Sequence, residues 1–316
     1  MKKIVYILLI MIVPISLMGQ RWKQERASIV FGPGTSHFLG DLGGGKKEAA
    51  HFFGVRDLDF VTTRPTAQGG YRYRIYEDFA VRGSLTYTLL SSKDEASQEI
   101  RRQARNLSFR SHVWDIGVQF EYSFIRDKQA PRYAFNSLSK ARQISAFLIL
   151  GGGGLYYNPQ AYFDGEWVNL RPLGTEGQGH VESYDYTTNP AKTEFATVYP
   201  KEYGKFTWHA TIGLGTKYNI NRYWSVGLDM TCRYTGSDYV DDAHDRYFNF
   251  EQEGIDSPMA AELADRQLYK GTDIEHEPWP SGQPYRGDPD YNDAYILSII
   301  TVHYKFKNTM RGQPKF

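Results

Sequence analysis

The segment from Phe206 to Tyr234 constrains the fold of this 316-residue chain more than any other part of it. In its first half one face holds Phe206, Trp208, Ala210, Ile212, Leu214, Thr216 and Tyr218. After a short turn at 219–222, one face of the second half holds Trp224, Val226, Leu228, Met230, Cys232 and Tyr234. A period of two residues is typical of β-strands, because successive side chains point to opposite faces. The segment is therefore predicted to be a β-hairpin.

The side chains of this hairpin indicate strands that cross a membrane. The apolar face is aliphatic in the middle and aromatic at both ends, whereas the other face carries Lys, Asp, Arg, Gly and Thr. Outer-membrane barrels turn an aliphatic band towards lipid, flank it with aromatic girdles and fill the lumen with polar groups. Each arm has about the 9–11 residues that a tilted strand needs to cross a bilayer. Aromatic residues make up 15% of the chain, which suits such girdles.

The same alternation predicts eight strands. They cover about 27–42, 68–75, 81–89, 112–124, 144–157, 206–218, 224–234 and 295–306, with a bend or bulge at Gly32-Pro33-Gly34. Short and long connections alternate, as they do when both termini lie in the periplasm. The fold class is therefore an all-β, eight-stranded antiparallel up-and-down transmembrane β-barrel with long extracellular loops. Two further strands would have to lie in 158–204 or 235–294, and some strands could extend as hairpins above the membrane.

The two ends of the chain agree with export to the outer membrane of a Gram-negative bacterium. Lys2 and Lys3 precede an apolar run from Ile4 to Met18, which predicts a signal peptide at 1–20. The barrel would then occupy 21–306, and 307–316 would form a basic periplasmic tail. The single cysteine, Cys232, excludes an intramolecular disulfide and is interpreted as a small lipid-facing hydrophobe.

The polar faces of the strands predict a network of charges inside the barrel. The charged residues assigned to the lumen are Arg72, Arg74, Arg82, Asp115, Glu121, Lys217, Asp229 and Arg233. An eight-stranded barrel is filled by its own side chains. With both signs present, we expect these residues to pair and to hold the barrel together, which argues against a conduit for proteins.

Four stretches of the sequence resemble the PorG-like outer-membrane barrels of Bacteroidetes-type bacteria. They are 36–42 (SHFLGDL), 151–179 (with PLGTEGQG), 224–248 (with DYVDD) and 259–266 (MAAELADR). The resemblance implies a component of the type IX secretion system, one that ties a periplasmic ring assembly to the outer membrane. It implies neither catalytic residues nor a cofactor.

Charge is distributed unevenly between the predicted loops. The loop 235–294 carries 15 acidic against 4 basic residues, whereas the periplasmic segment 126–142 has one acid. Its basic residues, the predicted docking site for periplasmic ring subunits, are Arg126, Lys128, Arg132, Lys140 and Arg142. The net charge of +1 argues against nucleic acid as a partner. Outer-membrane lipid is the other expected partner, and no small-molecule substrate is expected.

Two loop features suggest more specific roles. Asp238, Asp241, Asp242 and Asp245 crowd carboxylates as a calcium site would, but their spacing does not fit an EF-hand, so a solvated or Arg-paired acidic loop is the preferred interpretation. From Ser257-Pro258 onwards a short helix is predicted, with Ser257 as its N-cap. We expect this helix to pack over the barrel mouth.

Two other functions compete with the secretion role. Some eight-stranded barrels are enzymes that act on lipids, but the eight histidines here are scattered, and an enzyme is not expected. His209 and His303 are interpreted as inward-facing core residues. The alternative that remains open is a small outer-membrane barrel of the adhesion or membrane-integrity type, which would act through its extracellular loops.

Overall fold

The computed structural model describes residues 26–42, 60–97, 100–127, 143–179, 201–221, 223–245, 247–248, 250–251, 255–268 and 286–306. The predicted signal peptide and the predicted basic tail therefore lie outside the described residues. Of the described helices, none is long and apolar enough to span a membrane.

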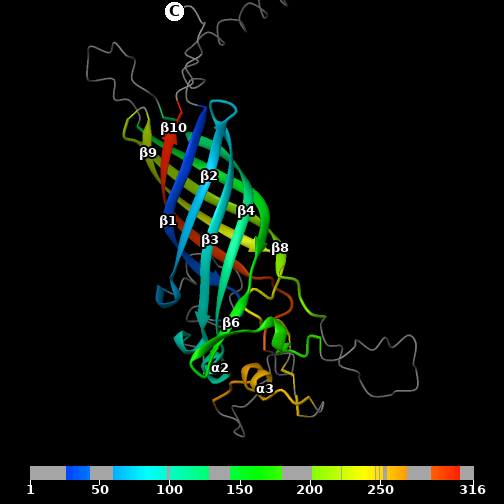
Figure 1. The fold of residues 1–316 in the computed structure, drawn as a ribbon. Coiled ribbons are helices and arrows are strands. Elements are labelled where there is room, and N and C mark those ends of the chain that lie inside the picture. Colours follow the sequence, from blue (N-terminus) through cyan, green and yellow to red (C-terminus); the bar gives the residue numbers. More distant parts are fainter. Residues whose placement is uncertain are drawn as a thin grey trace, which may run out of the picture.

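Eight strands form the wall of the molecule (Figure 1). They are β1 (Ala27–Leu39), β2 (Arg64–Arg74), β3 (Phe79–Lys93), β4 (Ser108–Ile125), β5 (Ile144–Tyr156), β8 (Phe206–Asn219), β9 (Trp224–Thr235) and β10 (Ala294–Lys305). The order of neighbours is β3-β2-β1-β10-β9-β8-β5-β4, and the additional pairing of β3 with β4 closes the ring. Every neighbouring pair is antiparallel. The fold is thus a closed eight-stranded antiparallel barrel, as predicted.

The two ends of the barrel differ in their connections. Only a few residues connect β2 to β3 and β8 to β9 at one end, here called the short-turn end, where the N–H of Ile75 donates to Phe79 and that of Ile220 donates to Trp224. The first and last described residues lie there too, because the backbone N–H of Arg74 donates to Arg26 and that of Phe306 donates to Ala27. The opposite end, called the long-connection end, carries the remaining described loops and helices (Figure 1).

Smaller elements cluster at the long-connection end. They are η4 (Phe60–Thr62), η5 (Asp94–Ala96), α2 (Ile100–Arg105), β6 (Pro159–Phe163), β7 (Glu166–Asn169), η6 (Arg171–Leu173) and α3 (Pro258–Ala264). β6 and β7 form a hairpin that pairs with the end of β4 through Gln160 and Arg110. These two strands lie in one of the loops where extra strands were left open, and they extend the sheet beyond the barrel.

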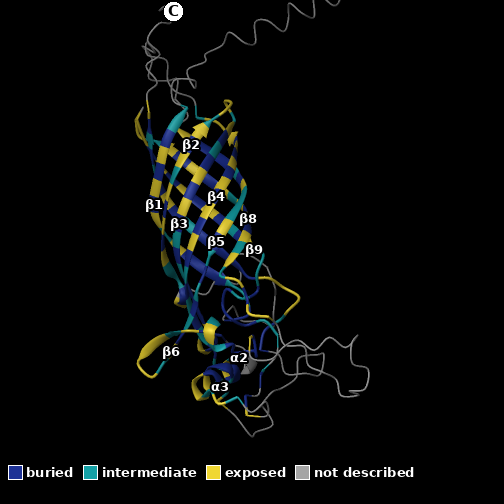
Figure 2. Ribbon diagram, turned by 45° about the vertical axis from the view of Figure 1, so that its right-hand side comes forward, coloured by how far each residue is buried: buried dark blue, intermediate teal, exposed yellow. Residues whose placement is uncertain are grey.

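Alternating burial along each strand separates an inner from an outer surface (Figure 2). β9, for example, reads exposed and buried in turn from Trp224 to Arg233, with only Cys232 intermediate. The exposed outer side chains are apolar, and they include Ile116 at 68%, Phe120 at 59% and Leu214 at 57% of their full surface.

Aromatic pairs mark both rims of this apolar band. Near the short-turn end, Phe79 and Tyr122 have ring centroids 5.0 Å apart, and those of Trp224 and Tyr304 are 4.9 Å apart. Towards the other end, the centroids of Tyr87 and Trp114 are 4.9 Å apart and those of Tyr156 and Phe206 are 5.0 Å apart. These pairs lie on outward-facing positions, as girdles at the two interfaces of a membrane do.

The register of β1 corrects one expectation. Gly32-Pro33-Gly34 is not a bulge, because β1 keeps one continuous register with β2 and with β10 from Phe31 to Gly34. The glycines instead allow a close backbone approach: a Cβ on Gly32 would lie 1.8 Å from the carbonyl oxygen of Ile300. The irregularity that does occur is between Ser123 and Ile125, where β4 shifts against β5.

Candidate functional site: buried networks of the lumen and the outer connections

Arg82 is the centre of the first network inside the barrel. Its guanidinium lies 2.9 Å from Glu121 Oε1 and 2.6 Å from Asp229 Oδ2, and it is almost completely buried. Glu121 also accepts a 2.6 Å hydrogen bond from Arg72 Nε. Because charge-assisted bonds of this kind are strong and directional, they tie β2, β3, β4 and β9 together across the lumen.

Asp115 organises a second network nearer the long-connection end. It accepts hydrogen bonds from Arg233 and, at 3.2 Å, from the hydroxyl of Tyr295, and it lies 3.0 Å from His209 Nε2. His209 Nδ1 in turn lies 3.0 Å from Thr211 Oγ1. This Asp-His-Thr arrangement has the residue types of a catalytic triad. All three side chains are buried inside the barrel, so the arrangement fits a structural core.

A third group lies towards the short-turn end. Arg74 pairs with Asp127 at 3.3 Å, and Asn219 Nδ2 donates to the same carboxylate at 2.7 Å. Lys217 is buried nearby on β8. The structure therefore places all eight charged residues assigned to the lumen on the inner side of the wall, and it joins seven of them in ion pairs. His303, which was also assigned inward, is buried there.

The inner surface becomes apolar near the long-connection end, which the sequence reading did not predict. A buried cluster there includes Phe38, Leu90, Phe109, Val113, Leu155, Tyr295, Leu297 and Ile299 from the strands. The residues that the connections add to this cluster are Leu42, Leu107, Tyr157, Tyr203, Val240 and Ala243. This cluster closes the end of the lumen, and we call it the apolar plug.

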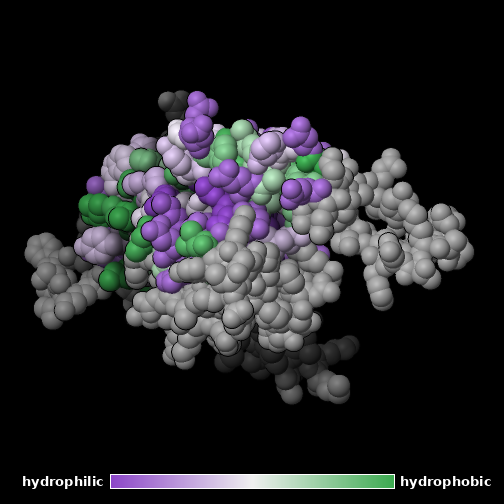
Figure 3. Space-filling view, turned by 90° about the horizontal axis from the view of Figure 1, so that it is seen from below, coloured by the Kyte–Doolittle hydropathy of each residue, from purple (hydrophilic) through white to green (hydrophobic). Residues whose placement is uncertain are grey.

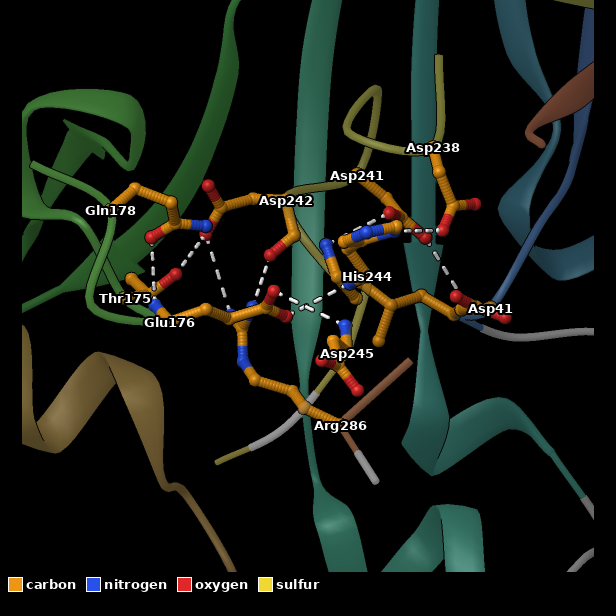
Figure 4. A network of polar contacts seen from close by, with 12 residues as sticks. Asp41, Thr175, Glu176, Gln178, Asp238, Asp241, Asp242, His244, Asp245 and Arg286 are labelled. Carbon is orange, nitrogen blue, oxygen red and sulfur yellow. Dashed lines mark hydrogen bonds and ion pairs between the residues drawn. The ribbon is translucent and has the colours of Figure 1, made fainter. Parts of the chain in front are cut away.

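A polar junction lies at this end, and Arg286 is its principal cation (Figure 4). Arg286 Nη1 donates to Glu176 Oε1 at 2.9 Å, and Nη2 lies 3.4 Å from Asp242 Oδ2. Asp242 also accepts 2.5 Å hydrogen bonds from the hydroxyls of Thr175 and Tyr203. Asp242 and Glu176 thus share one guanidinium, although they are 66 positions apart in the sequence.

Four further aspartates of the junction are held mainly by backbone N–H groups. Asp241 accepts from Ala243 and Leu42, and Asp293 accepts from Val240. Asp41 Oδ2 accepts from the N–H of Asp288 at 2.8 Å. Asp238 Oδ2 lies 2.7 Å from His244 Nδ1. All four side chains are buried. Of the loop aspartates named from the sequence, Asp238, Asp241 and Asp242 are buried and not solvated. The Arg-paired interpretation holds for Asp242, which binds Arg286, and not for Asp238 or Asp241 among the described residues.

Arg105 brings the β3–β4 connection into the same junction. Its guanidinium binds both carboxylate oxygens of Asp94 at 2.7 and 2.8 Å and donates to the carbonyls of Arg286 and Asp41. Consequently all four long connections meet here, because Asp41 follows β1, Glu176 lies between β5 and β8, and Arg286 lies between β9 and β10.

Burial and mutual repulsion raise the pKa values of several carboxyl groups of the junction. Burial raises the pKa of Glu176 to about 7, and it raises that of Asp241 to about 7 as well. The pKa values of Asp41 and Asp293 lie well above the usual range, because both groups are buried and close to the Asp241 carboxylate. Burial lowers the pKa of His244. Within the described part of the chain, no three His, Cys, Asp or Glu side chains are arranged to hold a metal ion.

The predicted docking residues are described only in part. Arg126 is half exposed and its guanidinium pairs with the carboxylate of Asp78 at the short-turn end. The other four residues, Lys128, Arg132, Lys140 and Arg142, lie outside the described ranges.

The predicted helix is shorter and lies elsewhere than expected. α3 spans Pro258–Ala264, and the side chain of Ser257 forms no capping hydrogen bond. Its buried Leu263 packs against Ala161 of β6 and against Leu170, the residue that follows β7. Ala260 and Ala264 contact the Phe248 and Phe250 cluster. The helix therefore supports the hairpin.

Viewed from the long-connection end, hydrophilic residues gather at the middle of the described surface (Figure 3).

Sequence reasoning missed the three residues that organise the junction: Arg105, Glu176 and Arg286. One available signal was that Arg286 is among only four basic residues in an acidic loop, where a cation is expected to attract several carboxylates. Glu176 lies within the PLGTEGQG stretch, but nothing in the sequence indicated which cation it would bind.

Together, the closed barrel, the apolar outer wall with aromatic rims and the charged interior define a small barrel of the outer-membrane type. No family model matches the chain, and no curated protein matches it.

Three solved structures are similar to it in shape. Ail, the attachment invasion locus protein of Yersinia pestis, is 11% identical, with 90% of this chain and 99% of that one covered and a TM-score of 0.34. Neisserial surface protein A is 9% identical, with 89% and 97% covered and a TM-score of 0.38. Outer membrane protein W of E. coli is 12% identical, with 89% and 99% covered and a TM-score of 0.29. At these values the similarities carry no argument about function.

Proposed function

We propose that the protein is a non-catalytic, integral outer-membrane component of a type IX protein secretion machinery. In this role the barrel is held in lipid, and its short-turn end faces the periplasm. There it contacts subunits of a periplasmic ring and ties that ring to the membrane.

The observation that carries this proposal is the convergence of the PorG-like stretches at one place. Asp41 comes from 36–42, Glu176 from 151–179, and Asp241 and Asp242 from 224–248. All of them meet in the polar junction (Figure 4). The fourth stretch, 259–266, includes most of α3, which packs on residues of the second. The resemblance therefore covers a buried structural unit, which strand patterns common to many barrels would not explain.

The outer wall supports a location in a membrane. Water-soluble proteins rarely leave a large continuous apolar surface exposed. Here exposed aliphatic and aromatic side chains surround the barrel between the two aromatic rims. Lipid is the environment in which such a band is stable, and a barrel of this kind belongs to the outer membrane.

The interior supports a structural role. The charge networks tie opposite walls of the lumen together, and the apolar plug fills its far end. A protein substrate would have to displace both. The buried Asp115-His209-Thr211 group offers no exposed surface to a lipid substrate.

The test is purification of the tagged protein in mild detergent, followed by identification of bound proteins by mass spectrometry. We expect periplasmic ring subunits to co-purify with the outer-membrane fraction. Reversal of Arg132, Lys140 and Arg142 to Glu should leave the barrel folded but lower the yield of ring subunits, because rim charges control association rate and salt sensitivity.

Two results would contradict the proposal. If the protein in the outer-membrane fraction carries no ring subunit, it has another role, and binding of host surfaces through the outer loops becomes the function to test. If ring subunits survive both the triple reversal and deletion of 307–316, the ring docks elsewhere on the barrel.

A further inference from the structure

Lys217 is a buried cation that makes no direct contact with a counter-charge among the described residues. It lies on β8 and retains only 3% of its surface exposed. Among the residues that the structure describes, none forms a hydrogen bond or an ion pair with its ammonium group. A buried charge without a partner is costly, so such groups usually contact a counter-charge or a ligand.

A second unused donor lies beside it. In the β5–β8 ladder Ser145 is the residue directly opposite Lys217. Ser145 is 2% exposed, and its hydroxyl has no hydrogen-bond partner. On the other side, the β9 residue paired with Lys217 is Gly227, which has no side chain that could bond to the ammonium group. Two buried donors on neighbouring strands therefore point into the same part of the lumen.

The described charges around this point are already engaged with one another. Arg72 and Arg82 share Glu121 and Asp229, and Arg74 binds Asp127. Arg72, Arg74 and Lys305 repel Lys217, whereas Asp127, which Arg74 already binds, attracts it.

We propose that the lumen binds a small free oxyanion of the phosphate class between Lys217 and Ser145. An oxyanion accepts hydrogen bonds from both donors and neutralises the charge of Lys217. The wall of the barrel separates Lys217 from lipid, so the anion comes from solution. It enters from the short-turn end, because β8 ends two residues after Lys217 and the apolar plug closes the opposite end.

The test is calorimetric titration of the full chain, refolded in a detergent free of phospholipid, with inorganic phosphate at pH 7 and fixed ionic strength. We expect saturable binding at one site. Lys217→Met should weaken it at least tenfold. Ser145→Ala should weaken it several-fold while leaving the urea midpoint in phosphate-free buffer unchanged. The matched control is Lys201→Met, because Lys201 is exposed and lies outside the strands.

The proposal fails if the wild-type protein shows no saturable uptake, or if Lys217→Met binds phosphate as the wild type does. It also fails if uptake requires added phospholipid, which would assign the anion to a headgroup. If Lys217→Met does not refold, Lys217→Arg replaces it, and because this variant keeps the charge we expect it to bind phosphate. In that case, an affinity for phosphate that is unaltered in Ser145→Ala would overturn the assignment.

Discussion

At the scale of single residues, Arg82 shows how this barrel uses charge. Its guanidinium is 1% exposed and joins two carboxylates that come from different strands, Glu121 on β4 and Asp229 on β9. A buried ion pair contributes little compared with apolar packing, but removing one member leaves its partner charged and buried. The lumen therefore depends on the whole network.

Arg82→Leu should impair assembly because Asp229 would lose its only ion-pair partner among the described residues. We expect a loss of about 3–5 kcal/mol, with the same direction for Asp229→Leu. Val226→Thr is the control, because Val226 lies on the outer face and loses only a little apolar contact. Heat-modifiable gel mobility and urea midpoints report the difference. Unchanged mobility in both charge variants would show that the network is dispensable.

At the scale of elements, β1 joins the first and last strands of the barrel, since it pairs with β2 on one side and with β10 on the other. A side chain at Gly32 would collide with the backbone of Ile300 on β10. By contrast Gly69, which is opposite Phe31 on β2, has open space where its Cβ would be. The close approach of two backbones therefore requires glycine at position 32, whereas the space at position 69 would accept a larger residue.

Gly32→Ala should destabilise the barrel by about 1–3 kcal/mol or more, as overpacking does. Gly69→Ala should be neutral or stabilise by about 0.5 kcal/mol, because alanine restricts the unfolded chain. Urea titration of the refolded proteins measures both. Equal midpoints for the two variants would mean that β1 and β10 separate enough to accept a methyl group.

At the scale of the whole molecule, the polar junction joins the four long connections above the apolar plug. It places the carboxyl groups of Asp41, Glu176, Asp241 and Asp293 in a buried environment and holds them with few cations. Since charged carboxylates are disfavoured there, the junction should respond to pH.

Stability should fall as pH rises from about 4 to about 7. In the folded protein the pKa values of Glu176 and Asp241 are about 7, above their ordinary values of 4.5 and 3.8, so the folded state binds more protons than the unfolded state in that window. Within the junction His244 has the opposite effect, because burial lowers its pKa, but it is one group against the carboxyl groups of Asp41, Glu176, Asp241 and Asp293. The urea midpoint should therefore be lower at pH 8 than at pH 5.

Glu176→Gln should make this pH dependence smaller, because the amide imitates the protonated acid. Glu251→Gln is the matched control, since Glu251 is exposed. A midpoint that rises between pH 5 and pH 8 would show that the junction carboxyls are ionised in the folded protein.

The sequence alone determined the barrel. Strict alternation in segments such as Trp224–Tyr234 specifies which side chains face outward, because the strand period is two whatever the surroundings. The number of barrel strands, the aromatic rims and the inward charges all follow from that local rule. The same local rule assigns Arg82 and Asp229 to the inner face of their strands, opposite the apolar face.

Only the tertiary structure decided what those residues contact. Arg82 and Asp229 are 147 positions apart, and Asp41 and Asp288 are 247 apart, so their pairing depends on how the strands close and how the loops cross. The β6–β7 hairpin, the apolar plug and the junction arise from the same non-local packing. Periodicity carries no information about such contacts, because they are set by the path of the chain through space.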